Sequence, residues 1–321
     1  MEFFLFLIQI LALPVLSPLF VGVIRKLKAR LQNRVGASVF QPYRDLWKLF
    51  HKDEVISTDA SYIFRFAPYL VFAVTVLVGA SVPVITTVAP SLFQGGMFSL
   101  SFLGSGDFIT MIYLLALATF FLALAGMDTG SGFGGFGSSR EMTMAALAEG
   151  GLFFSLLVAS VIAQSGNVFT MAESLGTLPF QSFVPLLIAF VAFFIALLAE
   201  NSRFPVDNPA THLELTMIHE AMILEYSGKR LALMEWASYT KLALFIALGS
   251  SIFLPFGVAT SFLPEMLVLS IPVFVVKAFL FLLAIAVIES TMAKFRIFRV
   301  PDLLFTSFVL SVIALVVTIT I

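Results

Sequence analysis

Eight apolar runs of about 19 to 24 residues alternate with more polar segments along the chain. They occupy residues 2–24, 67–90, 107–127, 142–164, 182–200, 236–258, 268–290 and 302–321. A helix needs roughly 20 mostly apolar residues to cross the hydrocarbon core of a bilayer, so each run predicts one transmembrane helix. The ten-residue alternating segments of a membrane β-barrel are absent. The pattern therefore predicts an all-α integral membrane protein with about eight transmembrane helices, in a single transmembrane domain over residues 1–321.

Composition agrees with a protein that is solvated mainly by lipid. Apolar residues make up 60% of the chain and charged residues only 12%, and the mean hydropathy is +1.05, which leaves little room for a separate soluble domain. The chain has no cysteine, which excludes disulfides, thiolate zinc sites and iron–sulfur clusters held by its own thiolates. The first run begins with the acidic Glu2 and lacks a basic leader, so we interpret it as a retained helix rather than a signal peptide.

Lys and Arg residues are distributed one-sidedly among the polar segments. Sixteen of the eighteen follow odd-numbered runs, and none follows an even-numbered run. Because Lys and Arg collect in cytoplasmic loops, we expect the segments after odd-numbered runs to face the cytoplasm and both chain ends to lie outside. The predicted cytoplasmic loops are residues about 25–66, 128–141, 201–235 and 291–301. The remaining two basic residues, Lys241 and Lys277, fall inside the sixth and seventh runs.

The first two of these loops have distinctive sequences. In the first, residues 43–52 place Leu46, Leu49 and Phe50 on one helical face opposite the charges, as in a helix that lies at the membrane surface. Such a helix serves either as a membrane anchor or as a docking surface. The second contains the glycine-rich stretch Asp128–Ser139, which should be costly to form as a regular helix. It lacks the features of phosphate-binding and dinucleotide-binding motifs, so we do not expect nucleotide binding.

The third loop is the most polar segment of the chain. Residues 213–225 can form a short helix, and His212, His219 and Glu220 suggest a zinc site. The zinc motif, however, needs two His residues four apart with a Glu between them, whereas these are seven apart. We therefore expect no metal site in this chain.

Several ionisable residues lie within or at the ends of the predicted transmembrane helices. A charge at the centre of such a helix costs about 2.5–3.5 kcal/mol on insertion scales, so it usually faces a protein interior or a water-filled path. Glu200 and Glu289 could simply reach the membrane surface, whereas Glu149 and Lys277 lie deeper. Carboxylates that lie close together in a partly desolvated region can pass protons along a chain. We therefore predict a proton or ion path that includes Glu149, Glu200, Asp207, Glu214, Glu220, Glu225, Glu289, Lys241 and Lys277.

Three stretches resemble a known family of membrane subunits. They are residues 29–55 (ARLQNRVGASVFQPYRDLWKLFHKDEV), 200–228, which ends in EYSG, and 288–304 (IESTMAKFRIFRVPDLL). The chain is similar, over nearly its whole length, to the family of subunit 1 of proton-pumping NADH:quinone oxidoreductase (complex I) and its bacterial counterpart, with relatives in membrane-bound nickel–iron hydrogenases and formate hydrogenlyase. The segment LAGMDTGSGFGGFGSSRE at 124–141 resembles the Asp-Thr-Gly-Ser and Ser-Arg-Glu pattern of the hydrogenase branch, which we therefore favour.

The resemblance implies a non-catalytic subunit that anchors a peripheral redox arm and couples its turnover to ion movement. The implied partners are a hydrogenase-like large subunit, an iron–sulfur small subunit, antiporter-like membrane subunits and the lipid bilayer of the inner (cytoplasmic) membrane, and not nucleic acid. The nickel–iron centre and the iron–sulfur clusters would belong to the partners, this chain would bind no cofactor, and a quinone site is compatible with the family. Arm docking or a quinone-like cavity is assigned to Arg30, Arg34, Asp45, Lys48, Asp128, Arg140, Glu141, Arg203, Tyr226, Arg296 and Arg299.

Two alternative functions remain open at this point. The first is a quinone-tunnel subunit of a respiratory NADH- or ferredoxin-linked quinone oxidoreductase, in which the same loops line the tunnel. The second is a stand-alone secondary transporter, which the absence of evident internal repeats disfavours.

Overall fold

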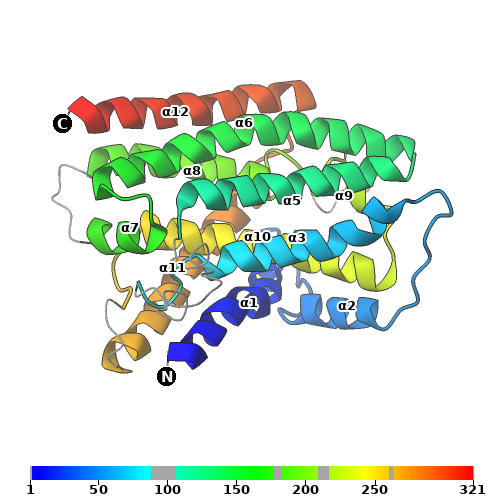
Figure 1. Ribbon diagram of the computed structural model, residues 1–321, viewed down its shortest axis with the longest axis horizontal. Helices are drawn as coiled ribbons and strands as arrows, with labels where there is room; N and C mark the ends of the chain where they lie inside the picture. The colour runs from blue at the N-terminus through cyan, green and yellow to red at the C-terminus, as the bar shows by residue number, and fades with distance from the viewer. Residues whose placement is uncertain (1, 88–105, 177–182, 209–216, 260–263, 321) are drawn as a thin grey trace, which may run out of the picture.

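The computed structural model describes residues 2–87, 106–176, 183–208, 217–259 and 264–320, which form a bundle of helices (Figure 1). Within these residues, eight helices are long and apolar enough to cross a membrane. They are α1 (Glu2–Leu31), α3 (Tyr62–Ala80), α5 (Phe108–Asp128), α6 (Gly132–Ala163), α8 (Phe183–Glu200), α10 (Gly228–Ile252), α11 (Pro264–Thr291) and α12 (Val300–Thr320). The predicted all-α membrane protein with about eight transmembrane helices is confirmed.

The long helices pack as two neighbouring groups. In one group α6 lies against α5, α8 and α12, and α12 forms one edge of the bundle in Figure 1. In the other group α10 packs against α1, α3 and α11. The largest cluster of buried apolar side chains joins the two groups and includes Leu242–Leu248 and Ile252 of α10. Every residue of α10 from Leu242 to Ile252 is buried. Helix α10 is therefore the most enclosed of the transmembrane helices.

Four short helices complete the described fold: α2 (Gln41–Phe50), α7 (Val168–Leu175), α9 (His219–Ile223) and the 3₁₀ turn η3 (Ile297–Arg299). Helix α2 is the amphipathic helix expected in the first loop. It buries Leu46 and exposes Trp47 and Lys48, and it lies beside α1 and α10.

The glycine-rich segment does not form the irregular loop predicted for it. That prediction was wrong, because α6 already begins at Gly132 and only residues 129–131 separate it from α5. The glycines allow close helix contacts that offset their low helix propensity. A Cβ atom on Gly134 would overlap the carbonyl oxygen of Gly126 in α5, and one on Gly137 would lie 2.9 Å from the carbonyl oxygen of Ile218 beside α9.

Helices also extend into the other predicted loops. Helix α1 continues to Leu31, and α10 begins at Gly228, eight residues before the sixth apolar run. The apolar runs mark only the part of each helix that suits lipid, whereas a helix can continue into the polar region beyond it. The first turn of α10 is held by Glu54, which accepts a hydrogen bond from the backbone N–H of Arg230 at 3.0 Å and forms an ion pair with its guanidinium.

Two prolines interrupt the hydrogen bonding of α1. Pro18 has no N–H to donate to the carbonyl oxygen of Pro14 one turn earlier. That oxygen accepts instead from the Ser17 hydroxyl and from Trp236 Nε1 of α10, both at 2.9 Å. The Tyr43 hydroxyl of α2 donates to the carbonyl oxygen of Val15 at 2.5 Å. Side chains from α2 and α10 thus complete the hydrogen bonding of this part of α1.

Candidate functional site

Charged side chains from separate helices meet at one end of the bundle. Glu289, near the end of α11, forms two ion pairs: its Oε2 lies 3.1 Å from Lys28 Nζ of α1, and its Oε1 lies 3.1 Å from Arg203 Nη1. Only 5% of Glu289 is exposed. A buried carboxylate with two cationic partners joins α1, α11 and the segment that follows α8, and we call this end of the bundle the charged end.

Asp207 sets the position of the short helix α9. Its Oδ1 pairs with Lys294 Nζ at 2.6 Å, and its Oδ2 accepts from the backbone N–H groups of Ile218 and His219 at 3.2 and 3.4 Å. These N–H groups belong to the start of α9, where helix donors lack partners within the helix. A buried carboxylate at this point both satisfies the donors and complements the helix dipole.

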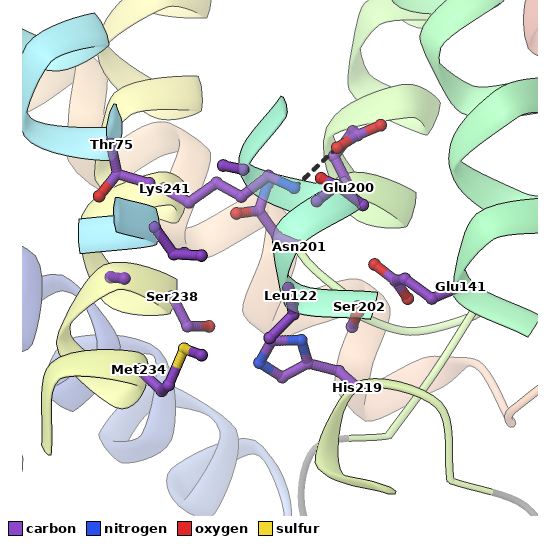
Figure 2. Close-up of a pocket in the computed structure, with 14 residues that line it drawn as sticks. Thr75, Leu122, Glu141, Glu200, Asn201, Ser202, His219, Met234, Ser238 and Lys241 are labelled. Atoms are coloured by element: carbon purple, nitrogen blue, oxygen red, sulfur yellow. Dashed lines mark hydrogen bonds and ion pairs between the residues drawn. The ribbon is translucent and has the colours of Figure 1, made fainter. Parts of the chain in front are cut away.

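Deeper in the bundle, Glu200 at the end of α8 pairs with Lys241 of α10, with 2.8 Å between Oε2 and Nζ. Glu200 Oε1 is also buried, and among the described residues it has no hydrogen-bond partner. Figure 2 shows this pair together with Glu141 of α6 and His219 of α9 around a small cavity. The cavity has a volume of about 40 Å³, enough for ordered water. We call it the inner chamber.

A much larger cavity, of about 610 Å³, lies at the charged end. We call it the outer cavity. Its ionisable lining includes both signs of charge: Arg25, Lys28, Arg34, Arg203, Asp207, His219, Glu220, Glu235 and Glu289. It shares four lining residues with the inner chamber: Asn201, Ser202, His219 and Ser238. A thin wall of polar residues therefore separates the two spaces.

The two ionisable residues at the start of α9 have shifted pKa values. Burial, and after it the nearby Lys241, lower the pKa of His219 to about 4, so the imidazole is neutral at pH 7. Burial raises the pKa of Glu220 to about 7, with the negative charges of Glu235 and Asp207 acting in the same direction. Glu220 can therefore exchange a proton near neutral pH.

The structure brings together only part of the predicted ion path. Glu200 and Lys241 line the inner chamber, and Asp207, Glu220 and Glu289 line the outer cavity. Glu149 lies apart from both, in a groove of about 330 Å³ between α5 and α6 that exposed Tyr113 and Phe120 also line. Glu225 lies on the exposed surface. Glu214 lies outside the described residues.

Lys277 is separated from the other predicted path residues. It lies in α11, only 4% exposed, and its Nζ donates to the carbonyl oxygens of Leu254 at 2.7 Å and Ser250 at 3.3 Å, at the end of α10. The Phe256 ring centre lies 5.4 Å from the same nitrogen. No carboxylate of the described residues forms an ion pair with Lys277.

The predicted docking residues divide into surface and interior groups. Those whose side chains are exposed are Arg30, Arg34, Lys48, Arg296 and Arg299. Partly buried Asp45 accepts from Gln41 within α2, Arg140 donates to the carbonyl oxygen of Met217 before α9, and Arg203 pairs with Glu289. Glu141, assigned from the sequence to arm docking or a quinone-like cavity, lines the inner chamber.

Two further residues of the predicted docking set make contacts that hold the fold. Tyr226 is 4% exposed, stacks on Phe64 at 4.0 Å between ring centres and donates to the Phe64 carbonyl oxygen at 2.9 Å. Asp128 accepts from the backbone N–H of Ser61 at 2.8 Å and its hydroxyl at 2.7 Å, and so anchors the start of α3. Both side chains hold the fold and line neither described cavity.

The sequence does not mark the residues of the wall or the contact of Glu54 with the first turn of α10. Asn201 and Ser202 belong to no motif, and the sequence suggests His219 only as a metal ligand. Glu54 does carry a sequence signal, because it lies in KDEV at the end of residues 29–55, the first stretch that resembles the family. Its partner Arg230 lies just after EYSG, the end of the second such stretch.

Comparison with known proteins confirms the resemblance. The model of the NADH dehydrogenase family matches residues 3–320. Hydrogenase-4 component C of Escherichia coli (strain K12) is 35% identical over 308 residues, covering 96% of this chain and 93% of that protein. Formate hydrogenlyase subunit 4 of the same organism is 33% identical over 310 residues, covering 97% and 96%.

More distant relatives extend the comparison. An NADH-quinone oxidoreductase subunit of Cytophaga hutchinsonii is 29% identical over 278 residues, covering 75% of this chain and 72% of that protein. A chain in the structure of the membrane-bound sulfane sulfur reductase, an archaeal respiratory membrane complex, has the same fold, with a TM-score of 0.81, 20% identity and 99% coverage of both chains. This multi-pass chain therefore belongs to the NADH dehydrogenase family of membrane subunits, with relatives in hydrogenase-4, formate hydrogenlyase and complex I-like assemblies.

Proposed function

We propose that this chain is the membrane anchor and ion-translocation coupling subunit of a nickel–iron hydrogenase or formate hydrogenlyase-like complex in the inner membrane. The observation that carries the proposal is the pair of adjoining cavities, which bring buried carboxylates and cations from the charged end into the bundle. Isolated charges are expensive inside a membrane and usually mark ion pathways. Similarity over nearly the whole chain to hydrogenase-4 component C and formate hydrogenlyase subunit 4 supports the type of complex.

The charged end is the proposed docking surface for the peripheral arm. Its exposed cations sit beside exposed apolar side chains, including Trp47 at 69% and Phe298 at 88% exposure. Large apolar side chains flanked by arginines are typical anchors of protein interfaces. On this surface we place a hydrogenase-like large subunit and an iron–sulfur small subunit, which would hold the nickel–iron centre and the clusters. The charged end would accordingly face the cytoplasm.

Coupling would proceed through the ion pairs between the surface and the inner chamber. Electron transfer in the docked arm would displace the segment that contains Arg203 and Asp207, and with it α9. A changed charge distribution around Glu141, Glu200 and Lys241 would then drive a proton or sodium ion inward. Glu149, two turns further along α6 than Glu141, would deliver the ion to antiporter-like subunits at the groove between α5 and α6.

The proposal is tested by purifying the assembly through a tag on this chain in mild detergent. Nickel and iron are quantified, and hydrogen evolution is assayed on the product. We expect about one nickel per chain together with hydrogen evolution. In proteoliposomes, Glu149→Gln should lower ion movement per hydrogen formed without dissolving the complex. A metal-free single chain, or unchanged coupling in this variant, would contradict the proposal.

A quinone-binding subunit of a respiratory oxidoreductase is the second candidate. The outer cavity favours it, because a volume of about 610 Å³ could hold a quinone ring, and the NADH-quinone oxidoreductase subunit of Cytophaga hutchinsonii is similar to this chain. Iron without nickel, together with inhibitor-sensitive quinone reduction by the purified assembly, would support this candidate against the first.

A further inference from the structure

His219 occupies the wall between the outer cavity and the inner chamber. Its imidazole extends from α9 toward Met234 and Ser238 of α10 (Figure 2). Asn201, Ser202 and Ser238 complete the wall, and among these four residues only His219 has a titratable side chain. A proton that moves between the two spaces can therefore pass through its ring.

The imidazole has no hydrogen-bond partner among the described residues, although it lines two polar spaces. A neutral imidazole has one donor nitrogen and one acceptor nitrogen. One nitrogen can therefore bind water on the side of the outer cavity while the other binds water in the chamber. The charged groups that act on the ring are Lys241 of α10 together with Asp207 and Arg203 of the segment after α8, and the cations outnumber the carboxylate. Burial of the ring, together with these cations, keeps the resting ring neutral.

The position of the ring is linked to the charged end. The backbone N–H of His219 donates to Asp207, and Asp207 pairs with Lys294 in the segment before η3. Helix α9 rests on glycine positions of α5 and α6: a Cβ atom on Gly137 would lie 2.8 Å from Ala221 Cβ. A shift of Asp207 would therefore carry His219 with it.

We propose that His219 is the gate and proton relay between the outer cavity and the inner chamber. The inference rests on the proposed coupling function and names the residue that controls entry to its ion path. The bare ring nitrogen accepts a proton from water in the outer cavity, and the other nitrogen releases its proton to water beside Glu141 and Glu200. The ring is then neutral in the opposite tautomer, and rotation of the ring restores the first one. Movement of α9 with Asp207 makes or breaks this contact.

The test uses the whole complex in proteoliposomes that contain a pH-sensitive dye. Reduced viologen drives hydrogen formation, and proton movement is measured at the same time. His219→Gln keeps polar atoms near the same position but cannot relay a proton, so proton movement per hydrogen formed should fall about tenfold or more, as for loss of a positioned acid–base group. The matched control is His51→Gln, since His51 is an exposed histidine at the end of α2.

A second variant separates the relay from a structural role. His219→Ala should show the same loss, and added imidazole should restore several-fold of the lost proton movement, because a free ring can enter the space that the side chain leaves. Nickel content reports assembly in every variant. Restoration by imidazole would not occur if His219 merely held α9 in place.

The outcomes are distinguishable. Full proton coupling in His219→Gln would overturn the relay and leave the coupling function intact. Failure of imidazole to restore proton movement in His219→Ala would have the same meaning. Movement of radioactive sodium without proton movement in the unaltered complex would also overturn the relay. Hydrogen formation without movement of either ion in the unaltered complex would overturn the coupling function as well.

Discussion

Two lysines lie inside transmembrane helices of this protein, and their surroundings differ sharply. Lys241 lies beside the inner chamber and pairs with Glu200, close to Glu141 and His219. Lys277 is more deeply buried, and it donates to backbone carbonyl oxygens at the end of α10. A lysine with a carboxylate partner and adjoining water can take part in charge movement. A lysine that caps a helix end stabilises the fold. The two lysines are therefore equally unfavourable by hydropathy, yet they have different roles in the structure.

The largest difference is expected from substituting each lysine by methionine. Lys241→Met leaves Glu200 as a buried carboxylate without a partner, which should cost about 3–5 kcal/mol and impair assembly. Lys277→Met removes a cation and leaves two carbonyl groups short of a donor, which should cost about 1–3 kcal/mol. Thermal unfolding in detergent measures both. The double variant Lys241→Met with Glu200→Gln should recover part of the loss, and equal effects of the two single variants would erase the distinction.

The next effect concerns the buried carboxylate of the charged end. Glu289→Gln breaks ion pairs with both Lys28 and Arg203, so it should cost roughly 3 kcal/mol. Lys28→Met should cost less, because the Lys28 side chain is 21% exposed and Arg203 remains as a partner. Thermal unfolding of the two variants is compared directly. A larger loss from Lys28→Met would mean that the pair with Arg203 contributes little.

Between about pH 4 and 7, the two ionisable residues at the start of α9 should give the stability a pH dependence. Glu220 has a pKa of about 7 against 4.5 for the free side chain, so the folded protein holds more protons than the unfolded one and stability falls as pH rises through this window. His219, with a pKa of about 4 against 6.5, gives the opposite slope between these values.

Glu220→Gln should remove its falling contribution, so between about pH 4.5 and 7 the stability of this variant should fall less steeply, or rise more steeply, with pH than that of the parent protein. Unfolding midpoints across this range provide the measurement. Lys277→Met should leave the profile of the parent protein in this range unchanged, and a Glu220→Gln profile with the slope of the parent protein would contradict the assignment to Glu220.

The smallest effect is expected from a side chain that only supports the fold. Tyr226→Phe keeps the stacking on Phe64 but removes the hydroxyl, so a buried carbonyl oxygen loses its donor. The cost should be about 1 kcal/mol, with coupling unchanged. Hydrogen evolution and ion movement per hydrogen are measured beside thermal unfolding. Loss of coupling would return Tyr226 to the candidate site.

Much of the fold follows from hydropathy, because bilayer thickness sets the length of each apolar run. Hydropathy does not predict where the helices end at the charged end, since α1, α6 and α10 continue into polar sequence. Glu200 and Lys241 could each be recognised as unusual, yet their pairing across 41 positions depends on how α8 and α10 pack. The sequence does not predict that the glycine-rich segment of α6 is helical. The close contacts with α5 and α9 that offset the low helix propensity of these glycines form only in the tertiary structure.

The prolines of α1 have a consequence for the order in which the protein is built. The carbonyl oxygen of Pro14 depends on Trp236, 222 positions later in the chain. While the ribosome is still making the later helices, the donor available to this oxygen is the Ser17 hydroxyl, which satisfies the backbone group in lipid before α10 exists. The contact with Trp236 forms only after the sixth transmembrane helix has been inserted, which makes the packing of the N-terminal helix against α10 a late step in biogenesis.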